Sequence, residues 1–294
     1  MIASLRARLR PEEALLLVYG LGLLALCLWA HMPYLTRTYH IPFLVVIAIV
    51  AALRAARERE HRVRAAVGAV RDFLPFFALI VVYETLHDLT PILRPRTVDG
   101  GLAALDRFLF GRDLAVWMTS FASPWLTRIM VFCYASYFFA PALLGGIIYL
   151  YGPRATFRRC MLSVSVASML GFLIYLLVPA VGPYIYQAAQ FPGRLPAATP
   201  GTHYVVEAID AVKGAARDCF PSMHTAHSTL VLLGARAFRR VLFWLYLPVA
   251  VGLYVATVYL RMHYAIDVLA GFALAGGAWW LAPQLELAWS GTAD

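Results

Sequence analysis

The sequence predicts an all-α fold, a polytopic transmembrane helical bundle of about eight spans. Of its 294 residues, 62% are hydrophobic and only 14% are charged, whereas a soluble domain carries about 25% charged residues. Its net charge of +9 comes mostly from arginines between apolar runs, a pattern that sets membrane topology rather than one that binds nucleic acid. A span needs roughly 20 residues, and suitable apolar runs begin near Leu15, Ile41, Phe73, Leu126, Cys160, His224, Val241 and Ala265.

Residues 1–90 are predicted to form an N-terminal domain of transmembrane helices with a basic connection. The first run follows Arg6, Arg8 and Arg10 but has no small-residue cleavage site, so we interpret it as a retained span rather than a signal peptide. The second run is short unless it borrows flanking residues. Residues 54–71 are rich in arginine with interspersed alanine and valine, which predicts an amphipathic helix on the cytoplasmic membrane surface.

Residues 91–284 are predicted to form a helical core, followed by a C-terminal tail over 285–294. Two segments of this core, 91–124 and 180–220, contain many proline and glycine residues and are predicted to be long loops, which are often functional in compact proteins. Four cysteines are scattered without metal-ligand spacing, and we interpret them as packing residues. They are Cys27, Cys133, Cys160 and Cys219.

The arginines orient the bundle. If the N-terminus and C-terminus are both cytoplasmic, four arginine-rich segments near residues 6–10, 54–71, 154–159 and 236–240 lie on the cytoplasmic side. Positive charge near span ends favours this orientation and an even number of spans. The segments around His224 and His263 then face away from the cytoplasm.

His263 and Asp267 form the first candidate for chemistry. They are four residues apart, so on a helix they share one face. Asp267 can accept the proton of one imidazole nitrogen, which leaves the lone pair of the other nitrogen exposed as a nucleophile. Intramembrane ionisable groups are candidates for function because they are costly unless paired. The structural alternative is that Asp267 caps its helix and His263 lies in the interface.

A second candidate begins the apolar run at residue 224. Pro221 suits the first turn of a helix, and Ser222 with the following N–H groups would form a phosphate-binding helix N-terminus. His224 lies in that turn, where it can donate a proton to a leaving oxygen, and His227 is expected to pack or support it. Zinc bound by His224, His227 and His263 is an alternative on ligand count, but the neighbouring residues fit a phosphate site better.

Both segments resemble motifs of the type 2 phosphatidic acid phosphatase (PAP2) superfamily. Pro221-Ser222-Met223-His224 is similar to its Pro-Ser-Gly-His motif, and residues 256–271 are similar to its third motif, Ser-Arg-x5-His-x3-Asp. The resemblance covers roughly residues 100–280 and implies a six-helix core. It also implies that His263 is the nucleophile, Asp267 orients it and His224 is the acid.

Several features resemble the inositol phosphorylceramide synthase and sphingomyelin synthase branch of that superfamily. They are methionine at 223 in place of glycine, the His-Tyr-x-x-Asp spacing at 263–267, the run 105–111 and the corner 179–183. Other positions depart from the superfamily pattern. Thr257 stands where an arginine is expected, whereas Arg261 would reach a phosphate only if the chain unwinds there; the alternative for Arg261 is a lipid head-group contact.

The first motif of the superfamily, Lys-x6-Arg-Pro, is not intact, and its nearest counterpart here is His87-x6-Arg94-Pro95. Glu84 and His87 share a helix face, as either an ion pair or part of a head-group cluster. The candidate phosphate-binding residues are therefore Ser222, Arg261, Arg94 and His87, with Lys213 and Arg217 as alternative cations.

Together these residues predict a multi-pass cell-membrane enzyme that transfers phosphoryl groups through a phosphohistidine at the extracytoplasmic face. Its expected partners are the bilayer, a lipid phosphate and a hydroxyl acceptor such as inositol, with no metal, cofactor or nucleic acid. The altered first motif and Thr257 favour a head-group phosphotransferase. With water as acceptor the protein would instead be a phosphohydrolase of phosphatidate or polyprenyl pyrophosphate.

Two further classes compete with an enzyme. The first is a non-catalytic lipid-binding or lipid-moving protein on the same scaffold, against which the retained histidines and aspartate argue. The second is a transporter, in which ionisable residues would lie near the bilayer midplane between broken helices. Here they cluster at the outer edge of the predicted spans.

Overall fold

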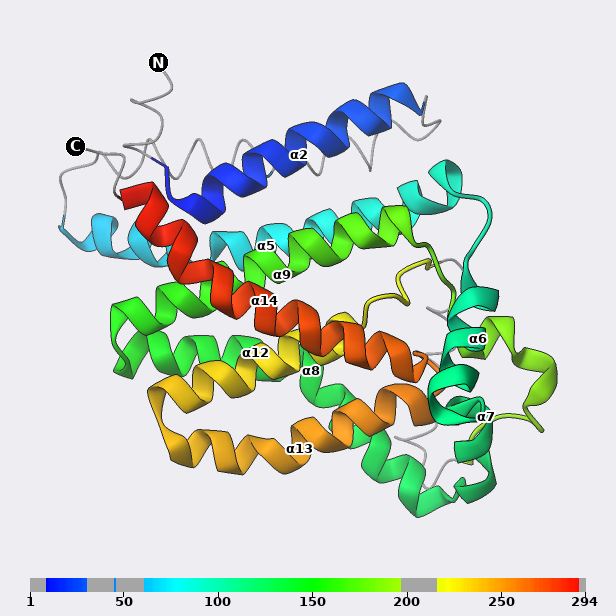
Figure 1. Cartoon of the computed structure of the whole chain (residues 1–294). Helices are drawn as coiled ribbons and strands as arrows, with labels where there is room; N and C mark the ends of the chain where they lie inside the picture. The colour runs from blue at the N-terminus through cyan, green and yellow to red at the C-terminus, as the bar shows by residue number, and fades with distance from the viewer. Residues whose placement is uncertain (1–8, 31–44, 46–60, 197–215, 291–294) are drawn as a thin grey trace.

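The computed structural model describes residues 9–30, 45, 61–196 and 216–290, which fold into a bundle of long α-helices (Figure 1). The long helices are α2 (Pro11–Trp29), α5 (His61–Leu93), α8 (Pro124–Tyr151), α9 (Arg154–Leu177), α12 (Met223–Phe238), α13 (Arg240–Tyr259) and α14 (Ala265–Ser290). The short helices are α6 (Asp99–Phe110), α7 (Leu114–Met118), α10 (Pro183–Tyr186) and the 3-10 turns Thr119–Phe121 and Ala188–Gln190. These ranges contain no β-strand, and the predicted all-α bundle is confirmed.

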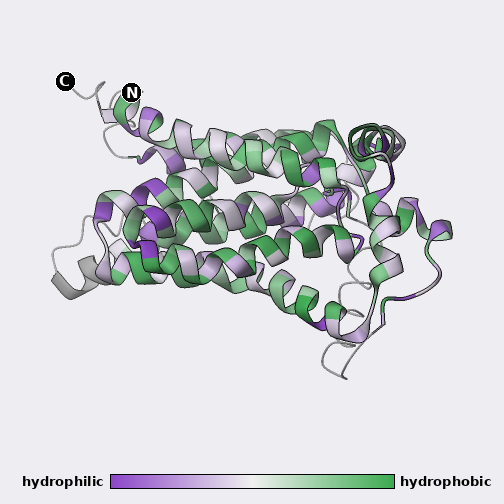
Figure 2. Cartoon of the chain, turned by 60° about the horizontal axis from the view of Figure 1, so that its bottom comes forward, coloured by the Kyte–Doolittle hydropathy of each residue, from purple (hydrophilic) through white to green (hydrophobic). Residues whose placement is uncertain are grey.

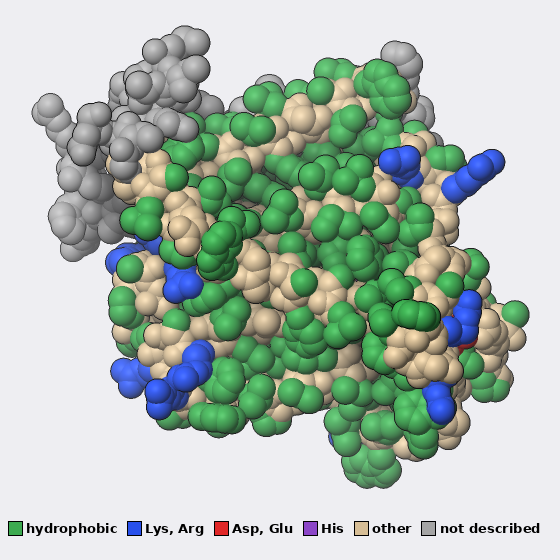
Figure 3. Space-filling view, viewed as in Figure 1, with side chains coloured by type: hydrophobic (Ala, Val, Ile, Leu, Met, Phe, Trp, Pro, Cys, Tyr) green, Lys and Arg blue, Asp and Glu red, His purple; other side chains and the backbone are tan. Residues whose placement is uncertain are grey.

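Six of the long helices are long and apolar enough to cross a membrane, so the chain is a multi-pass membrane protein. Hydrophobic residues fill the middle of the bundle, and arginine side chains gather toward its two ends (Figures 2 and 3). Of the eight predicted spans, the one near Ile41 lies outside the described residues except for Val45. The one beginning at His224 is α12, whose 16 residues extend about 24 Å at 1.5 Å per residue.

α12 lies at the centre of the bundle, where it packs against α8, α9, α13 and α14. Its buried face carries small and branched side chains, including Ala226, Leu230 and Ala235. The N-terminal helix α2 packs against α5, α9 and α14. The short helices α6 and α7 lie at one end of the bundle (Figure 1), the end at which α12 and α14 begin.

The opposite end of the bundle is held by pairs between arginine and carboxylate side chains. They join α9 and the start of α2 with α5 and the end of α14. Glu286, one of the paired carboxylates, is separated by about 28 Å of helix from Asp267 in the first turn of α14. The pairs are Arg10–Asp72, Arg71–Glu13, Arg158–Glu12 and Arg158–Glu286, with nitrogen–oxygen distances of 2.5, 2.5, 3.4 and 2.9 Å. Arginines from three of the predicted cytoplasmic segments therefore meet at the end remote from His224 and His263.

The structure differs from the sequence predictions in two segments. From His61 onward the predicted surface helix is the beginning of α5 and continues unbroken to Leu93; residues 54–60 lie outside the described ones. Residues 91–124 contain α6 and α7 rather than one long loop, because Leu102, Ala103 and Asp106 recur on a buried helix face. The predicted division into domains at residues 90 and 284 stays a prediction; α5 crosses residue 90 and α14 crosses residue 284.

Candidate active site

Each of the two sequence motifs lies where a helix begins. Ser222 is the N-cap of α12, and its hydroxyl accepts a hydrogen bond from the backbone N–H of Thr225 at 3.3 Å. Because Ser222 takes the cap position, Pro221 precedes the helix, joined to Phe220 by a cis peptide bond, and does not lie in the first turn as predicted. The N–H of Ser222 donates to the carbonyl oxygen of Asp267 at 3.1 Å, which ties the starts of α12 and α14 together.

His263 lies in the turn between α13 and α14, two residues before α14 begins. The carbonyl oxygen of Thr257 accepts hydrogen bonds from the N–H groups of Met262 and His263 at 3.0 and 3.1 Å. Arg261 has a positive φ of 64°, so the chain unwinds there. The expectation that His263 and Asp267 share a helix face is therefore wrong, although the turn still brings the two side chains together.

Two imidazole rings meet at the centre of the site. Nδ1 of His224 lies 3.2 Å from Nε2 of His263. On the other side of its ring, Nδ1 of His263 lies 2.7 Å from the carbonyl oxygen of Cys219 and 3.4 Å from Oδ2 of Asp267. A carbonyl oxygen only accepts hydrogen bonds, so it favours the tautomer with the proton on Nδ1 of His263. The lone pair on Nε2 then faces His224.

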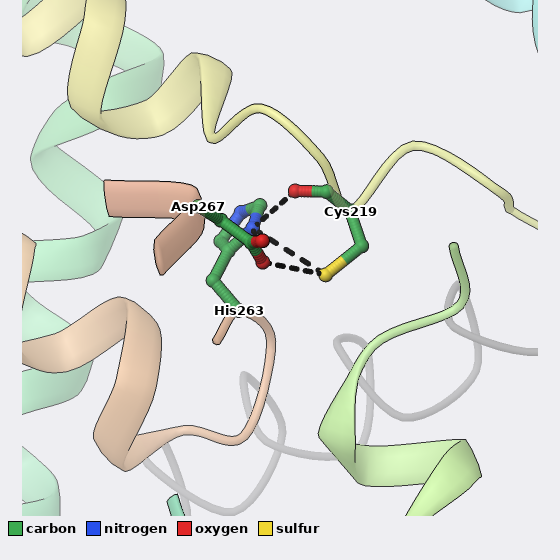
Figure 4. A group of neighbouring side chains, drawn as sticks. All are labelled: Cys219, His263 and Asp267. Carbon is green, nitrogen blue, oxygen red and sulfur yellow. Dashed lines mark hydrogen bonds and ion pairs between the residues drawn. The ribbon is translucent and has the colours of Figure 1, made fainter. Parts of the chain in front are cut away.

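Cys219 joins His263 and Asp267 through both its backbone and its side chain (Figure 4). Its Sγ donates a hydrogen bond to Oδ2 of Asp267 at 2.9 Å. Burial raises the pKa of the Cys219 thiol well above its ordinary value, and the neighbouring Asp267 adds to this effect, so the thiol stays protonated as a donor. The sequence analysis interpreted Cys219 as a packing residue, whereas it contacts both His263 and Asp267. The one feature of the sequence that pointed to a place in the site is its position three residues before Ser222.

Two carboxylates of α6 position the backbone around these side chains. Asp106 accepts hydrogen bonds from the N–H groups of Ala265 and Ile266 at 2.9 and 2.8 Å and so fixes the start of α14. Asp99 accepts from the hydroxyl of Tyr264 at 3.0 Å and from the backbone of the 181–182 corner. The sequence analysis noted the run 105–111, which contains Asp106, and the corner 179–183 as family features, but it assigned no role to Asp99 or Asp106.

Aromatic rings of α8 hold His224. Tyr134 stacks on the His224 ring with centroids 4.6 Å apart, and the centroid of Tyr137 lies 4.2 Å from it. His227 contacts the hydroxyl of Tyr137 through Nδ1 at 3.3 Å and that of Ser168 through Nε2 at 2.9 Å. His227 thus lies behind Tyr137, in the place expected for a supporting residue.

The four predicted phosphate-binding residues occupy three different places. Ser222 caps α12 and is fully buried. Arg261 donates from Nη1 to the carbonyl oxygen of Gly193 at 2.7 Å and lies over the ring of Phe191. His87 lines a small polar pocket near the end of α5 together with Tyr83, Thr90, Tyr175, Arg217 and Asp218.

Arg94 lies beside that pocket. Its Nε donates to the carbonyl oxygen of Leu176 at 3.2 Å, and its own carbonyl oxygen accepts a hydrogen bond from Arg217. Arg217 directly precedes Asp218 and Cys219 in the chain, so the pocket adjoins the segment that contacts His263. Lys213 lies outside the described residues.

Gly271 allows α14 to approach the start of α12. A Cβ atom at this position would lie 2.6 Å from the carbonyl oxygen of Ser222 and 2.8 Å from Cβ of Thr225.

We expect Gly271→Ala to destabilise the protein by about 1–3 kcal/mol through overpacking and to lower turnover by separating the two helix starts. Thermal unfolding in detergent micelles measures this effect. Gly276→Ala is the matched control in the same helix, because its Cβ would meet no atom within 4 Å; equal unfolding temperatures for the two variants would contradict the expectation.

The fold and the paired helix starts define a multi-pass, all-α membrane protein with a buried polar cluster at one end of its bundle. A family model for the PAP2 superfamily matches residues 101–281, more than half of the chain. The chain belongs to this superfamily of membrane lipid phosphatases and phosphotransferases, which confirms the resemblance found in its motifs.

Among curated proteins, the chain is similar to an inositol phosphorylceramide synthase of Candida albicans. The two are 25% identical over 217 residues, which cover 68% of this chain and 45% of the relative. The chain therefore matches less than half of the relative's length. No solved structure matches the chain significantly.

Proposed function

We propose that this chain is a lipid phosphotransferase that works through a phosphohistidine on His263. The observation that carries the proposal is the contact of 3.2 Å between Nε2 of His263 and Nδ1 of His224, with the opposite nitrogen of His263 engaged by Cys219. In this arrangement Nε2 of His263 has a lone pair that can act as a nucleophile, and Nδ1 of His224 has a proton that it can donate. Phosphoryl transfer through a phosphohistidine needs both groups.

The proposed first step is an attack by Nε2 of His263 on the phosphorus of a lipid phosphate. The phosphorus–oxygen bond to the leaving group breaks as the phosphorus–nitrogen bond forms. His224 enters the step as an imidazolium, and its Nδ1 proton passes to the departing oxygen, which leaves His224 as a neutral imidazole. The positive charge that develops on the His263 ring is stabilised by the carbonyl oxygen of Cys219 at 2.7 Å and the Asp267 carboxylate at 3.4 Å.

In the second step an acceptor hydroxyl attacks the phosphorus. Its proton returns to Nδ1 of His224, and the phosphorus–nitrogen bond breaks to restore the resting pair. Water as acceptor would give hydrolysis, and an alcohol such as inositol would give transfer. The similarity to an enzyme named inositol phosphorylceramide synthase supports transfer, as does the 3% exposure of His263, which limits its contact with water.

We propose that the phosphate is held by the free N–H groups at the start of α12, with Arg261, His87 and Arg94 as candidate cations. Ser222 supports this cradle as the N-cap of α12. The reaction is proposed to occur at the extracytoplasmic face. The arginine pairs at the opposite end of the bundle support this orientation, because positive charge marks the cytoplasmic side.

The proposal is tested by incubating the purified protein with phospholipids and polyprenyl pyrophosphate, each with and without inositol. Mass spectrometry then detects either free phosphate or a new lipid. A new lipid is the expected product, and free phosphate alone would assign the hydrolase instead. If neither product forms with any donor, the chain is a non-catalytic lipid-binding protein and the proposal is wrong.

A further inference from the structure

The side chains behind His263 are three different types of metal ligand. Cys219, His263 and Asp267 offer sulfur, nitrogen and oxygen atoms that all lie within 4.8 Å of one another. Their side chains point toward a common centre (Figure 4). They are almost fully buried, with exposures of 4%, 3% and 0%.

The distances between these atoms are close to those of a tetrahedral zinc site. Zinc bonds of about 2.0–2.3 Å place neighbouring tetrahedral ligands about 3.3–3.6 Å apart. Nδ1 of His263 lies 3.4 Å from Oδ2 of Asp267 and 3.7 Å from Sγ of Cys219. The third distance, 2.9 Å between Sγ and Oδ2, is a hydrogen bond whose proton would leave when a metal binds.

Asp267 provides a second, independent observation. Its Oδ1 is buried and has no hydrogen-bond partner within the part of the chain that the structure describes. A buried carboxylate oxygen without a partner is costly, and a cation beside the carboxylate would offset this cost. In the absence of a metal, Nδ1 of His263 has the carbonyl oxygen of Cys219 as its hydrogen-bond partner at 2.7 Å.

We propose that Cys219, His263 and Asp267 form an inhibitory site for a thiophilic divalent cation such as Zn²⁺ or Cd²⁺. Thiolate and imidazole select such ions over Mg²⁺ or Ca²⁺, which take oxygen ligands. Binding releases the thiol proton of Cys219 to solvent. The metal takes the lone pair of Nδ1 in His263, and the ring proton moves from Nδ1 to Nε2.

Inhibition follows from this change of tautomer. An Nε2 that carries a proton has no lone pair with which to attack phosphorus, and it can no longer accept the proton of His224. The metal site itself rests on the geometry of three side chains and on the unpartnered Oδ1 of Asp267. Its inhibitory effect rests on the proposed function, in which Nε2 of His263 is the nucleophile.

Metal binding is tested first without any assay of activity. The purified, metal-stripped chain is titrated with Cd²⁺, and the ultraviolet absorption band of the cadmium–thiolate bond is recorded. Cys219→Ser removes the thiolate while keeping a hydroxyl that can donate to Asp267. Cys133→Ser is the matched control, because Cys133 is also buried but lies in α8. We expect the band at one equivalent in the unmodified protein and in Cys133→Ser, and its loss in Cys219→Ser; an unchanged band in Cys219→Ser overturns the site.

Inhibition is tested next with Zn²⁺ and with Mg²⁺, using any lipid donor that the protein turns over. We expect Zn²⁺ but not Mg²⁺ to inhibit, and Cys219→Ser to need at least about tenfold more Zn²⁺ than Cys133→Ser for half inhibition. Equal sensitivity of the two variants overturns the inhibitory site while leaving the phosphotransferase proposal intact. Cd²⁺ binding that depends on Cys219, in a protein that turns over no donor, supports the site and contradicts the proposed function.

Discussion

His263→Ala is expected to abolish turnover, with a loss of at least about 10⁴-fold in kcat. The variant removes the only atom proposed to form a bond to phosphorus. Of its described neighbours, His224 is the proposed acid and contacts it through Nδ1, and the thiol of Cys219 lies on the far side of the His263 ring, donating to Asp267. Neither of these two described side chains can replace the nucleophile. Turnover of a phospholipid donor measures this effect. The protein should still insert into membranes, because the side chain contributes little to the packing of long helices.

A chemical trap separates loss of the nucleophile from loss of the fold. With a donor labelled at phosphorus, acid-labile label should appear on the unmodified protein and be absent from His263→Ala. His227→Ala is the matched control, because it removes a histidine that lies behind Tyr137 and contacts Ser168; it should keep the label. Near-normal turnover in His263→Ala would refute the assignment of the nucleophile.

The second large effect is expected from His224→Gln, and it should depend on the leaving group. Loss of a general acid costs about 10²–10⁴-fold when the departing oxygen is a poorly stabilised alkoxide, as in a diacylglycerol phosphate. A pyrophosphate lipid releases a phosphate oxygen, which needs less help from a proton. We therefore expect a much smaller loss of kcat with polyprenyl pyrophosphate than with phosphatidate.

Comparison of the two donors also tests the role of His224 against a purely structural one. If Tyr134 and Tyr137 merely needed an imidazole to pack against, both donors would lose the same factor. Equal losses would therefore contradict an acid role for His224. Labelled His263 should still be trapped in His224→Gln with the pyrophosphate donor.

Most of the fold was predictable because the signal for a membrane span is strong. A run of about 20 apolar residues has few other structures available to it, since every backbone polar group in the bilayer must be satisfied within a helix. The amphipathic helix α6 was missed, because its glycines and the prolines that precede it resemble those of a loop. Its buried face became apparent only against α14 and the 179–183 corner.

The paired motifs predicted that His224, His263 and Asp267 belong to one site, and the structure brings their side chains together. The sequence did not predict how they are held there. Cys219 contacts two of these residues across 44 and 48 positions of the chain, and Asp106 reaches Ala265 across 159. Contacts between such distant residues depend on the packing of whole helices, which no local pattern encodes.

The shortness of α12 sets the depth at which the chemistry can occur. A helix of about 24 Å falls short of the hydrocarbon thickness of about 30 Å, and Arg236 and Arg239 at its C-terminal end are expected to anchor that end at the water boundary. The first turn of α12, with His224, then lies beneath the level of the ester groups, or the leaflet thins around it. The head group of a lipid would therefore reach His224 by moving a short distance toward the bilayer centre, while its acyl chains stay in the leaflet.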